Sequence, residues 1–227
     1  MVTSGLGAAL AIAKKDILTQ FRKKFEIFSM FLFALISVIA FSFAVVTGGS
    51  VSEEVGSALL WVIIFFTGMF GFSPIFLSES ETGTLRGLAT APIPAWSVYF
   101  GKVIYGFTLM GIVEVFLVPI VSVLFGFSLF SNIPLALATL VIGTLDLAAV
   151  GSMASALTMP SESKATVFPL VYFPTATSGL MLLIEITKIA VLGPGLIPVL
   201  VILEMLLAHL IAILTLSASV FHFALSS

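Results

Sequence analysis

The sequence predicts an all-α integral membrane protein, and two observations predict that fold class: its composition and its long apolar stretches. Of its 227 residues, 60% are hydrophobic and only 9% are charged, whereas soluble domains carry about 25% charged residues. The mean hydropathy is +1.27. The chain has no cysteine, which excludes disulfides and thiolate metal ligands within it.

Six apolar stretches each come close to the ~20 residues that a helix needs to cross about 30 Å of hydrocarbon. They are expected near residues 28–46, 58–77, 103–125, 135–157, 166–186 and 196–221. The connections between them are polar or rich in glycine and proline. Residues 1–227 are therefore expected to form a single transmembrane domain, with no soluble domain of useful size.

The distribution of lysine and arginine predicts the orientation of these spans, because both residues are retained on the cytoplasmic side. With the N-terminus in the cytoplasm, only Lys188 of the 9 cationic residues falls outside. The others are then cytoplasmic: Lys14, Lys15, Arg22, Lys23, Lys24, Arg86, Lys102 and Lys164. An even number of spans places the C-terminus in the cytoplasm as well.

The segment before the first span, about residues 5–27, has the pattern of an amphipathic helix. Large apolar residues recur on one face: Leu6, Leu10, Ile17, Phe21, Phe25 and Phe28. The opposite face is polar: Lys15, Asp16, Thr19, Arg22, Lys23 and Glu26. Such a helix is expected in the cytoplasmic interface, with its cations toward anionic lipid. The alternative is a charged extension of the first span.

The polar stretch SESETGTLRGLATAPIPA, residues 78–95, connects the second and third spans on the cytoplasmic side. Ser78 and Glu81 form a capping-box pattern, in which each side chain bonds to the backbone N–H of the other residue. This pattern predicts a short helix near residues 79–90. Pro92 is expected to end it, because the residue before a proline is pushed out of the helical region.

Leu85, Leu88 and Ala89 form a small apolar patch on this short helix, since they are three and four residues apart. One interpretation is that the patch inserts into a groove on a soluble partner. The other is that the helix lies on the membrane with the patch toward lipid. The pattern alone leaves both open.

With these residues the chain resembles the membrane subunits of ABC exporters of the haem exporter protein B (CcmB) type, within the type-2 ABC permeases. The family pattern has an acidic residue, a glycine four positions later, a small hydroxyl residue, two leucines, a proline-rich exit and a lysine. It maps without gaps onto Glu79, Gly83, Thr84, Leu85, Leu88, Pro92, Pro94 and Lys102. A weaker match is Gly143-Thr144 with Gly151 in the fourth span.

The resemblance implies that the short helix is a coupling helix, which docks on a separate ATP-binding subunit. The docking residues would be Glu79, Glu81, Gly83, Thr84, Leu85, Leu88 and Pro92. The chain lacks the G-x-x-x-x-G-K-[ST] loop that holds ATP phosphates, so ATP hydrolysis would belong to that partner. We therefore expect this chain to be a permease subunit, not an enzyme, and to hold no cofactor itself.

The resemblance also implies a setting and a substrate. The setting is the cell membrane of a prokaryote, where a second permease copy or a homologue completes the transport path. The substrate area is haem export or cytochrome c maturation, with cytochrome c maturation proteins as further partners and no nucleic acid. The alternatives are a type-2 ABC permease for a lipid, drug or glycan, and a non-transporting membrane scaffold.

Two acids are expected inside the membrane, because Glu114 and Asp146 fall near the middles of the third and fourth spans. An ionised carboxylate costs about 3 kcal/mol at that depth. No lysine or arginine is expected there, so we expect no intramembrane ion pair within the chain. Either the carboxyls are protonated and bonded to a neighbouring helix, or they line a translocation path. Pro169 and Pro174 predict an irregular fifth span and are further candidates for that path.

The histidines do not indicate a metal site. His209 and His222 are 13 residues apart, about 220° around a helix, so they share no face. An intramembrane enzyme would need clustered acids or histidines at one membrane face, and Glu79 with Glu81 is too small a cluster. We therefore predict no metal ligand and no catalytic residue.

Overall fold

A computed structural model of the chain describes residues 5–46, 50–76, 79, 87, 90–126, 132–159, 161, 164–193 and 196–226. All elements within these ranges are helices: α1 (Gly5–Arg22), α2 (Lys24–Val45), α3 (Glu53–Phe72), α6 (Ala95–Phe125), α7 (Ile133–Leu157), α8 (Lys164–Leu192) and α9 (Leu196–Ser226). Among them, 6 helices are long and apolar enough to cross a membrane, and α1 is not one of these. The predicted fold class is confirmed.

Local capping groups explain where several of these helices begin and end. The Ser52 side chain accepts a hydrogen bond from the Val55 N–H, which starts α3. Asn132 caps α7 in the same way through Leu135. At the end of α6, Gly126 adopts a left-handed φ of 60°, which glycine tolerates without strain.

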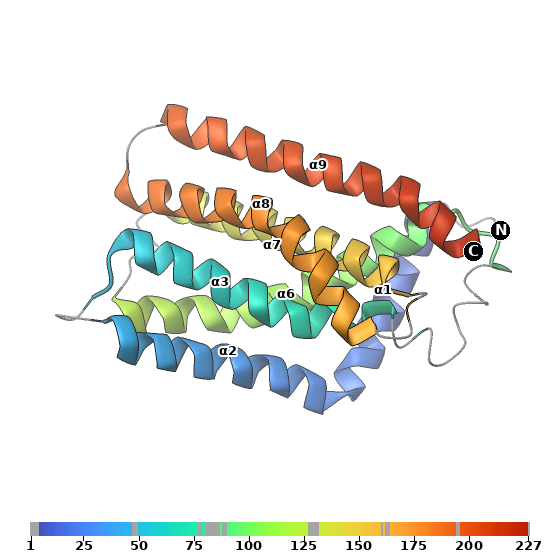
Figure 1. The fold of residues 1–227 in the computed structure, drawn as a ribbon, viewed down its shortest axis with the longest axis horizontal. Helices are drawn as coiled ribbons and strands as arrows, with labels where there is room; N and C mark the ends of the chain where they lie inside the picture. The colour runs from blue at the N-terminus through green and yellow to red at the C-terminus, as the bar shows by residue number, and fades with distance from the viewer. Residues whose placement is uncertain are drawn as a thin grey trace.

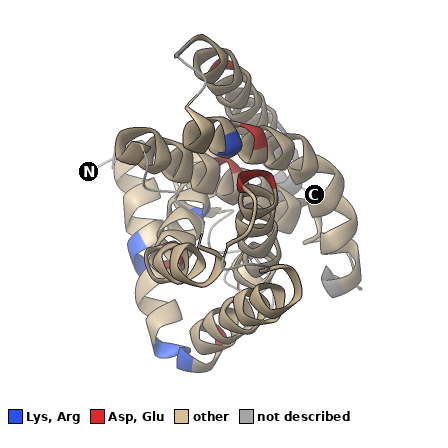
Figure 2. Cartoon of the chain, turned by 90° about the vertical axis from the view of Figure 1, so that its left-hand side faces the viewer, with Lys and Arg blue, Asp and Glu red and all other residues tan. Residues whose placement is uncertain are grey.

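The six long helices run side by side as a bundle, and α1 lies across one end of it (Figure 1). We call this the α1 end: it holds α1, the last turn of α3 and the start of α6 (Figure 1). Seen along the bundle, charged residues are sparse and most of the ribbon is neither acidic nor basic (Figure 2). This arrangement places the connection between α3 and α6 at the same end as α1.

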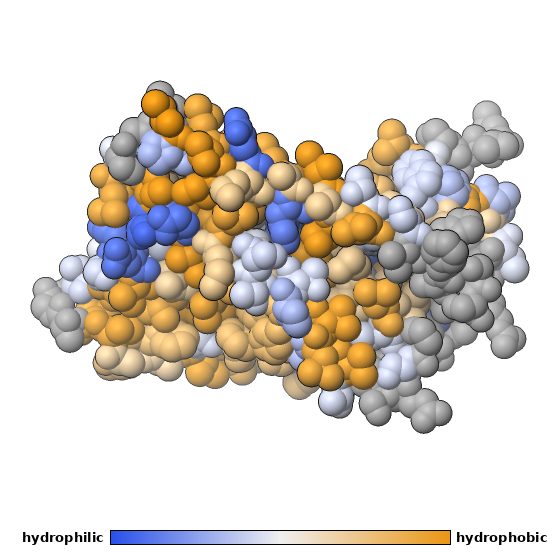
Figure 3. All heavy atoms as spheres, turned by 45° about the horizontal axis from the view of Figure 1, so that its top comes forward, coloured by the Kyte–Doolittle hydropathy of each residue, from blue (hydrophilic) through white to orange (hydrophobic). Residues whose placement is uncertain are grey.

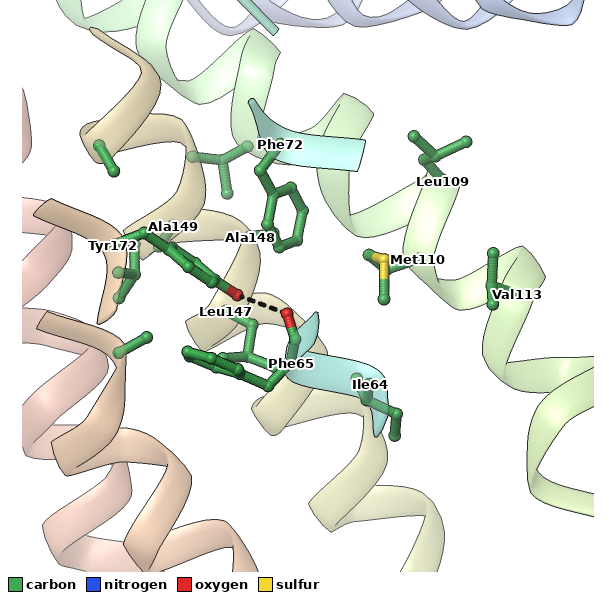
Figure 4. Packing of buried hydrophobic residues seen from close by; sticks show 14 of the residues in the cluster. Ile64, Phe65, Phe72, Leu109, Met110, Val113, Leu147, Ala148, Ala149 and Tyr172 are labelled. Atoms are coloured by element: carbon green, nitrogen blue, oxygen red, sulfur yellow. Dashed lines mark hydrogen bonds between the residues drawn. The ribbon is translucent and has the colours of Figure 1, made fainter. Parts of the chain in front are cut away.

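The core lies around α3, which is much more enclosed than α2. In the most apolar stretch of each helix, 61% of residues are buried for α3 but only 17% for α2. The Phe65 and Tyr172 rings stack at 4.9 Å, and the Tyr172 hydroxyl donates to the Phe65 carbonyl at 3.5 Å (Figure 4). Aromatic pairs from α3 and α8 therefore form the centre of the bundle.

Glycines of α7 leave room for two aromatic rings of α3. A side chain at Gly143 would clash with the Trp61 ring, and one at Gly151 would clash with the Phe72 ring. The Trp61 indole N–H in turn donates to the Thr187 hydroxyl on α8 at 2.7 Å. Close approach at glycine is the usual way in which membrane helices gain packing contacts, because lipid tails are as apolar as leucine.

The sides of the bundle are apolar, as expected for contact with lipid. Figure 3 shows broad hydrophobic areas along the bundle. Large exposed apolar side chains lie on several spans, and Phe43 of α2 is 88% exposed while Val123 of α6 is 80% exposed. Such a surface is rare on soluble monomers. The chain is a multi-pass membrane protein.

The fifth span, α8, contains both Pro169 and Pro174 and yet remains one helix. It bends along its length, as Figure 1 shows. The hydroxyls of Thr175 and Thr177 donate back to carbonyls one turn earlier, those of Val171 and Phe173. Proline and this back-bonding both bend helices without ending them.

The first helix has a third face that the sequence pattern did not reveal. The large apolar face is exposed, with Leu6 at 69% and Leu10 at 60%, so it remains free for lipid. A separate strip of small residues and one isoleucine is buried: Ala8, Ala9, Ile12 and Ala13. The first helix is therefore packed on the bundle as well as exposed to the interface.

Candidate functional site

Four charged residues meet at the α1 end, and we call them the charge cluster: Lys15, Asp16, Glu79 and Lys102. They come from α1, from the connection after α3 and from the start of α6. Two cations face two carboxylates, so the formal charges cancel. The cluster therefore ties three separate segments together without leaving a net charge in a partly buried place.

Lys102 is the centre of the charge cluster, and only 1% of this residue is exposed. Its Nζ lies 2.8 Å from Glu79 Oε1 and 2.9 Å from Asp16 Oδ2. The same ammonium donates to the Ile75 carbonyl at 3.1 Å and lies 5.2 Å from the centre of the Phe76 ring. A buried ammonium is tolerated here because all of these partners surround it.

Glu79 and Lys15 have pKa values that follow from this pairing. Burial acts to raise the pKa of Glu79, but the charge of Lys102 and the hydrogen bonds from Lys102 and Lys15 hold it below its ordinary value. Burial acts to lower the pKa of Lys15, but its bonds to Glu79 and Asp16 hold it above its ordinary value. Both groups are therefore charged at neutral pH.

Close packing holds α1 against α6 beside the charge cluster. A Cβ at Gly101 would lie 2.9 Å from the Ala9 carbonyl oxygen and 2.9 Å from Ile12 side-chain atoms. At the start of the helix, a side chain on Gly5 would clash with the Trp96 ring. The sequence pattern placed Asp16 on the polar face of this helix but did not predict its partner. Its side chain is only 11% exposed and pairs with Lys102.

Of the residues expected on the coupling helix, Glu79 and Pro92 are described. Glu79 is 4% exposed and turns toward the bundle, whereas Pro92 is exposed. The other expected docking residues lie outside the described residues: Glu81, Gly83, Thr84, Leu85 and Leu88. Glu79 thus positions the connection, through Lys102, and presents no free carboxylate to a partner.

Glu79 and Lys102, the acidic residue and the lysine at the two ends of the resemblance pattern, are in direct contact. They are 23 residues apart in the sequence, and their side chains form a hydrogen bond of 2.8 Å. This bond joins the connection after α3 to the first third of α6 at the α1 end. On the α3 side, the Ser155 hydroxyl accepts from the Phe76 N–H at 3.2 Å and donates to the Ser73 carbonyl at 3.2 Å.

Glu114 is 6% exposed, and its Oε2 lies 2.6 Å from the Thr144 hydroxyl on α7. This contact matches one of the two interpretations considered for the intramembrane acids, a carboxyl bonded to a hydroxyl of a neighbouring helix. The Thr144 hydroxyl is also 2.6 Å from the Leu140 carbonyl, one turn earlier in α7. The bond joins α6 to α7 at a place where the resemblance has Gly143-Thr144.

Asp146 forms an intramembrane pair that the sequence analysis did not expect. This residue is 0% exposed, and its Oδ1 lies 2.8 Å from Nδ1 of His209 on α9. The other ring nitrogen, Nε2, lies 2.9 Å from the Ser178 hydroxyl on α8. The sequence analysis considered only lysine and arginine as partners for the intramembrane acids and did not consider histidine.

The contacts from Asp146 through His209 to Ser178 form a line, and the positions of its hydrogens follow from counting donors. The Ser178 hydroxyl has one hydrogen and lies 3.2 Å from the Thr175 carbonyl, which only accepts. The hydroxyl therefore donates to Thr175 and accepts from Nε2–H of His209. One proton is then shared between Nδ1 and the Asp146 carboxyl, so the pair is neutral overall. A neutral pair is the arrangement that the membrane interior tolerates best.

Ser178, His209 and Asp146 have the connectivity of a hydrolase triad, but the surroundings do not support hydrolysis. Ser178 lies inside the continuous helix α8, so the backbone N–H groups near it are already bonded within that helix. The described residues around it provide no pair of free donors for an oxyanion. We therefore assign Ser178, His209 and Asp146 to the packing of α8, α9 and α7 against one another.

The candidate path residues do not converge on one point. Thr144 and Asp146 are two residues apart, about 200° around α7, so the Glu114 and Asp146 bonds lie on opposite sides of that helix. Pro169 and Pro174 lie in α8, before Ser178. The side chain of His222 lies outside the described residues, whereas His209 has a clear role. No group of 3 or more metal-binding side chains occurs in the described part of the chain.

Sequence reasoning missed Ser178, Gly179 and the pairing role of His209. A side chain at Gly179 would clash with Asp146 Oδ2, and its Cβ would lie 3.1 Å from the His209 ring. The available signal was an acid and a histidine, each in the middle of a predicted span, with a Ser-Gly pair in a third. Buried ionisable residues in spans usually have partners, so this combination could have suggested contact.

The fold and these sites define a class of protein: a six-helix, multi-pass membrane protein with a peripheral helix fixed to one end by buried charges. Comparison with known families gives a match to the family described as CcmB protein over residues 7–227. The chain belongs to the CcmB family, which confirms the resemblance seen in the connection at 78–95.

Individual relatives agree with this family. The chain is similar to heme exporter protein B of Rhodobacter capsulatus, at 29% identity over 142 residues, which covers 63% of this chain and 65% of that protein. It is also similar to heme exporter protein B of Haemophilus influenzae, at 26% identity over 73% of this chain and 74% of that protein. The protein of that name from Pseudomonas aeruginosa is 24% identical over 68% of this chain and 69% of its own length.

Proposed function

We propose that this chain is the membrane-spanning permease subunit of an ABC exporter, coupled to a separate ATPase subunit. The observation that carries the proposal is the family match over residues 7–227, with relatives named heme exporter protein B. The position of the charge cluster supports it, since the connection between α3 and α6 is fixed to two helices and can pass on an applied force.

The coupling step follows from the contacts at the α1 end. The ATPase would press on the short helix of the connection, through Leu85 and Leu88. Movement of the connection would act on α6 through the bond from Glu79 to Lys102, which is 2.8 Å long. It would also act on α1, because the Lys15 ammonium donates to Glu79 Oε1 at 2.7 Å. The spans and the interfacial helix would therefore move together.

Haem is the substrate that the names of the relatives support, in export or in cytochrome c maturation with the proteins of that process. A lipid, drug or glycan substrate and a scaffold role are the competing assignments. We place the α1 end in the cytoplasm of a prokaryotic cell, with both termini there, since Lys15 and Lys102 lie at this end. A second copy of the chain, or a homologue, would complete the transport path.

A co-purification experiment tests the coupling proposal. The chain is expressed together with a candidate ABC ATPase subunit, and the amount of ATPase retained on the purified permease is measured. Leu85→Asp is expected to reduce retention at least tenfold, because a carboxylate would enter an apolar contact. Gly87→Asp is the matched control: it adds the same charge two residues away, on the opposite face of a helix. Equal retention in both variants, or no retention by the wild type, would reject the proposal.

A second experiment tests the substrate. The complex is reconstituted in lipid, and its ATPase rate is measured with haem and with a panel of lipids, drugs and glycans. Stimulation by haem alone supports haem export. Stimulation by another compound instead would keep the permease assignment and replace the substrate, and an ATPase rate indifferent to every compound would favour the scaffold. Size measurement of the same complex counts the permease copies.

A further inference from the structure

A groove between α6 and α7 opens on the side of the bundle and is apolar except at one point. Its volume is about 320 Å³, near the lower end of the range of ligand pockets. Its apolar lining includes Phe107, Gly111, Val115, Pro119, Leu137 and Val141, and its polar point is Glu114 with Thr144. Val115 is 70% exposed and Val141 is 52% exposed, so the groove faces the lipid around a membrane-spanning bundle.

The hydrogen-bond contacts of Thr144 determine what Glu114 offers to this groove. The Thr144 hydroxyl is 2.6 Å from Glu114 Oε2 and 2.6 Å from the Leu140 carbonyl oxygen. A hydroxyl has one hydrogen, so it cannot donate to both. Both contacts are hydrogen bonds when Glu114 is protonated on Oε2 and donates to Thr144, while Thr144 donates to Leu140. Oε1 is then a neutral carbonyl acceptor.

That acceptor has no partner within the described part of the protein. Glu114 Oε1 is buried, and no donor of the described residues is bonded to it. Glu114 as a whole is only 6% exposed. An unpaired buried acceptor is rare in folded proteins and destabilising, so it calls for an explanation.

Pro119 lies near Glu114 in the lining of the same groove. Pro119 is inside α6 and has no backbone N–H. The carbonyl of Val115, four residues earlier, therefore lacks the intrahelical donor that it would otherwise have. Val115 and Pro119 both line the groove. The groove thus combines apolar walls with one unpaired side-chain acceptor, Glu114 Oε1, and its ligand should supply a donor.

We propose that this groove binds a membrane-soluble alcohol or phenol, whose hydroxyl donates to Glu114 Oε1 while its apolar body lies along α6 and α7. An acyl chain has no donor, and an ammonium would require an ionised carboxylate instead of a protonated one. A water molecule would donate to the same oxygen but would leave the apolar walls of the groove without contacts. The proposal does not depend on the permease function, because it concerns only contacts within α6 and α7.

Photolabelling in lipid vesicles tests this site directly. The full chain, in phosphatidylcholine and phosphatidylglycerol vesicles, is labelled with a diazirine-bearing hexadecanol, and the labelled peptides are mapped by mass spectrometry. We expect labels in residues 107–119 and 137–144, and we expect excess hexadecanol to compete with them. Hexadecyl methyl ether has the same chain but no donor, so it should compete about tenfold less well.

Three variants separate the acceptor from the cavity. Glu114→Leu removes the acceptor and should weaken labelling about tenfold. Glu114→Gln keeps a carbonyl oxygen and an N–H for Thr144, so labelling should stay within about threefold of wild type. Gly111→Leu should abolish labelling by filling the groove, since a Cβ there meets no atom within 4 Å and the fold can accept it. Val201→Leu on α9 is the control and should change nothing.

Several results would overturn the proposal. Equal competition by the alcohol and the ether would show that no donor is recognised. Labels spread evenly over all lipid-facing helices would show solvation by the probe and no site. Cross-links between two copies through cysteines at 115 and 141, with loss of labelling, would show that a second chain covers the groove. If Glu114→Leu does not fold, the alcohol-to-ether ratio in wild type and Glu114→Gln decides the question.

Discussion

The charge cluster at the α1 end differs from the hydrogen bonds inside the bundle that run from Asp146 through His209 to Ser178. Both hold separate segments together, but their charges differ. Each joins three segments that are far apart in the sequence. The charge cluster uses two lysines and two carboxylates, which are joined by short ion pairs. The line inside the bundle uses one histidine and one acid that share a proton, so it carries no net charge.

The difference follows from what else holds each region together. The first helix packs closely on α6 through a strip of small residues, and the charge cluster adds ion pairs to that contact. Inside the bundle, aromatic rings and glycine contacts already hold α3, α7 and α8 together. The proton shared by Asp146 and His209 therefore fixes the positions of these two side chains and adds little to the free energy of unfolding. Removing a charge should therefore matter more at the α1 end than inside the membrane.

The largest effect is expected for Lys102→Met. This change leaves two carboxylates buried without their central cation, and breaking such a pair costs about 3–5 kcal/mol. Thermal unfolding in detergent should show a marked loss, which Asp16→Asn with Glu79→Gln should partly reverse. The control is Lys188→Met, which removes the exposed i, i+3 pair with Glu185 and should leave the unfolding curve unchanged. Similar curves for both variants would mean that the charge cluster adds little.

A smaller loss is expected for Gly179→Ala inside the bundle. The new Cβ would clash with Asp146 Oδ2, so α8 would have to move away from α7 and α9. Overpacking of this kind costs about 1–3 kcal/mol. Gly111→Ala is the matched control, because its Cβ meets no atom within 4 Å and alanine favours a helix. Both free energies of unfolding can be measured in the same detergent, and equal values would contradict the described packing at Gly179.

The interaction between Asp146 and His209 should be weaker still. A double-mutant cycle with Asp146→Ala and His209→Ala should give a coupling of about 0.6–1.7 kcal/mol, the range measured for hydrogen bonds between membrane helices. A coupling near zero would mean that the pair, although 2.8 Å apart, adds nothing beyond its packing. A coupling as large as the effect of Lys102→Met would remove the distinction between the two regions.

Features that depend on a local pattern along the chain could be predicted from the sequence. The spans depend on apolar length, a local property, and the family resemblance depends on a pattern within one connection. The contact of Asp16 with Lys102 was missed because helical periodicity shows which residues share a face but not what that face meets. His209 and Asp146 are 63 residues apart, and only the packing of α7 against α9 brings them together. Long-range pairing was therefore the part that could not be predicted.

The smallest effect expected is that of pH near neutrality, and it also distinguishes the two regions. The pKa of Glu79 is held below 4.5, so its contribution to stability is complete above that value and is lost as pH falls through the lowered pKa. The pKa of Lys15 is held above 10.5, so its contribution is complete below that value and is lost as pH rises through the raised pKa. Attachment of α1 should therefore not change between these limits.

Spin labels can measure this directly, because the chain has no native cysteine. Labels at Leu10→Cys on α1 and Val115→Cys on α6, both at exposed positions, report the distance between the two helices. We expect one distance distribution across neutral pH and a broader one only in acid below the Glu79 limit or in strong base. In Glu79→Gln the acid change should disappear, because no carboxylate remains at that position to be protonated. A distance that changes near neutral pH would mean that a group outside the charge cluster controls α1.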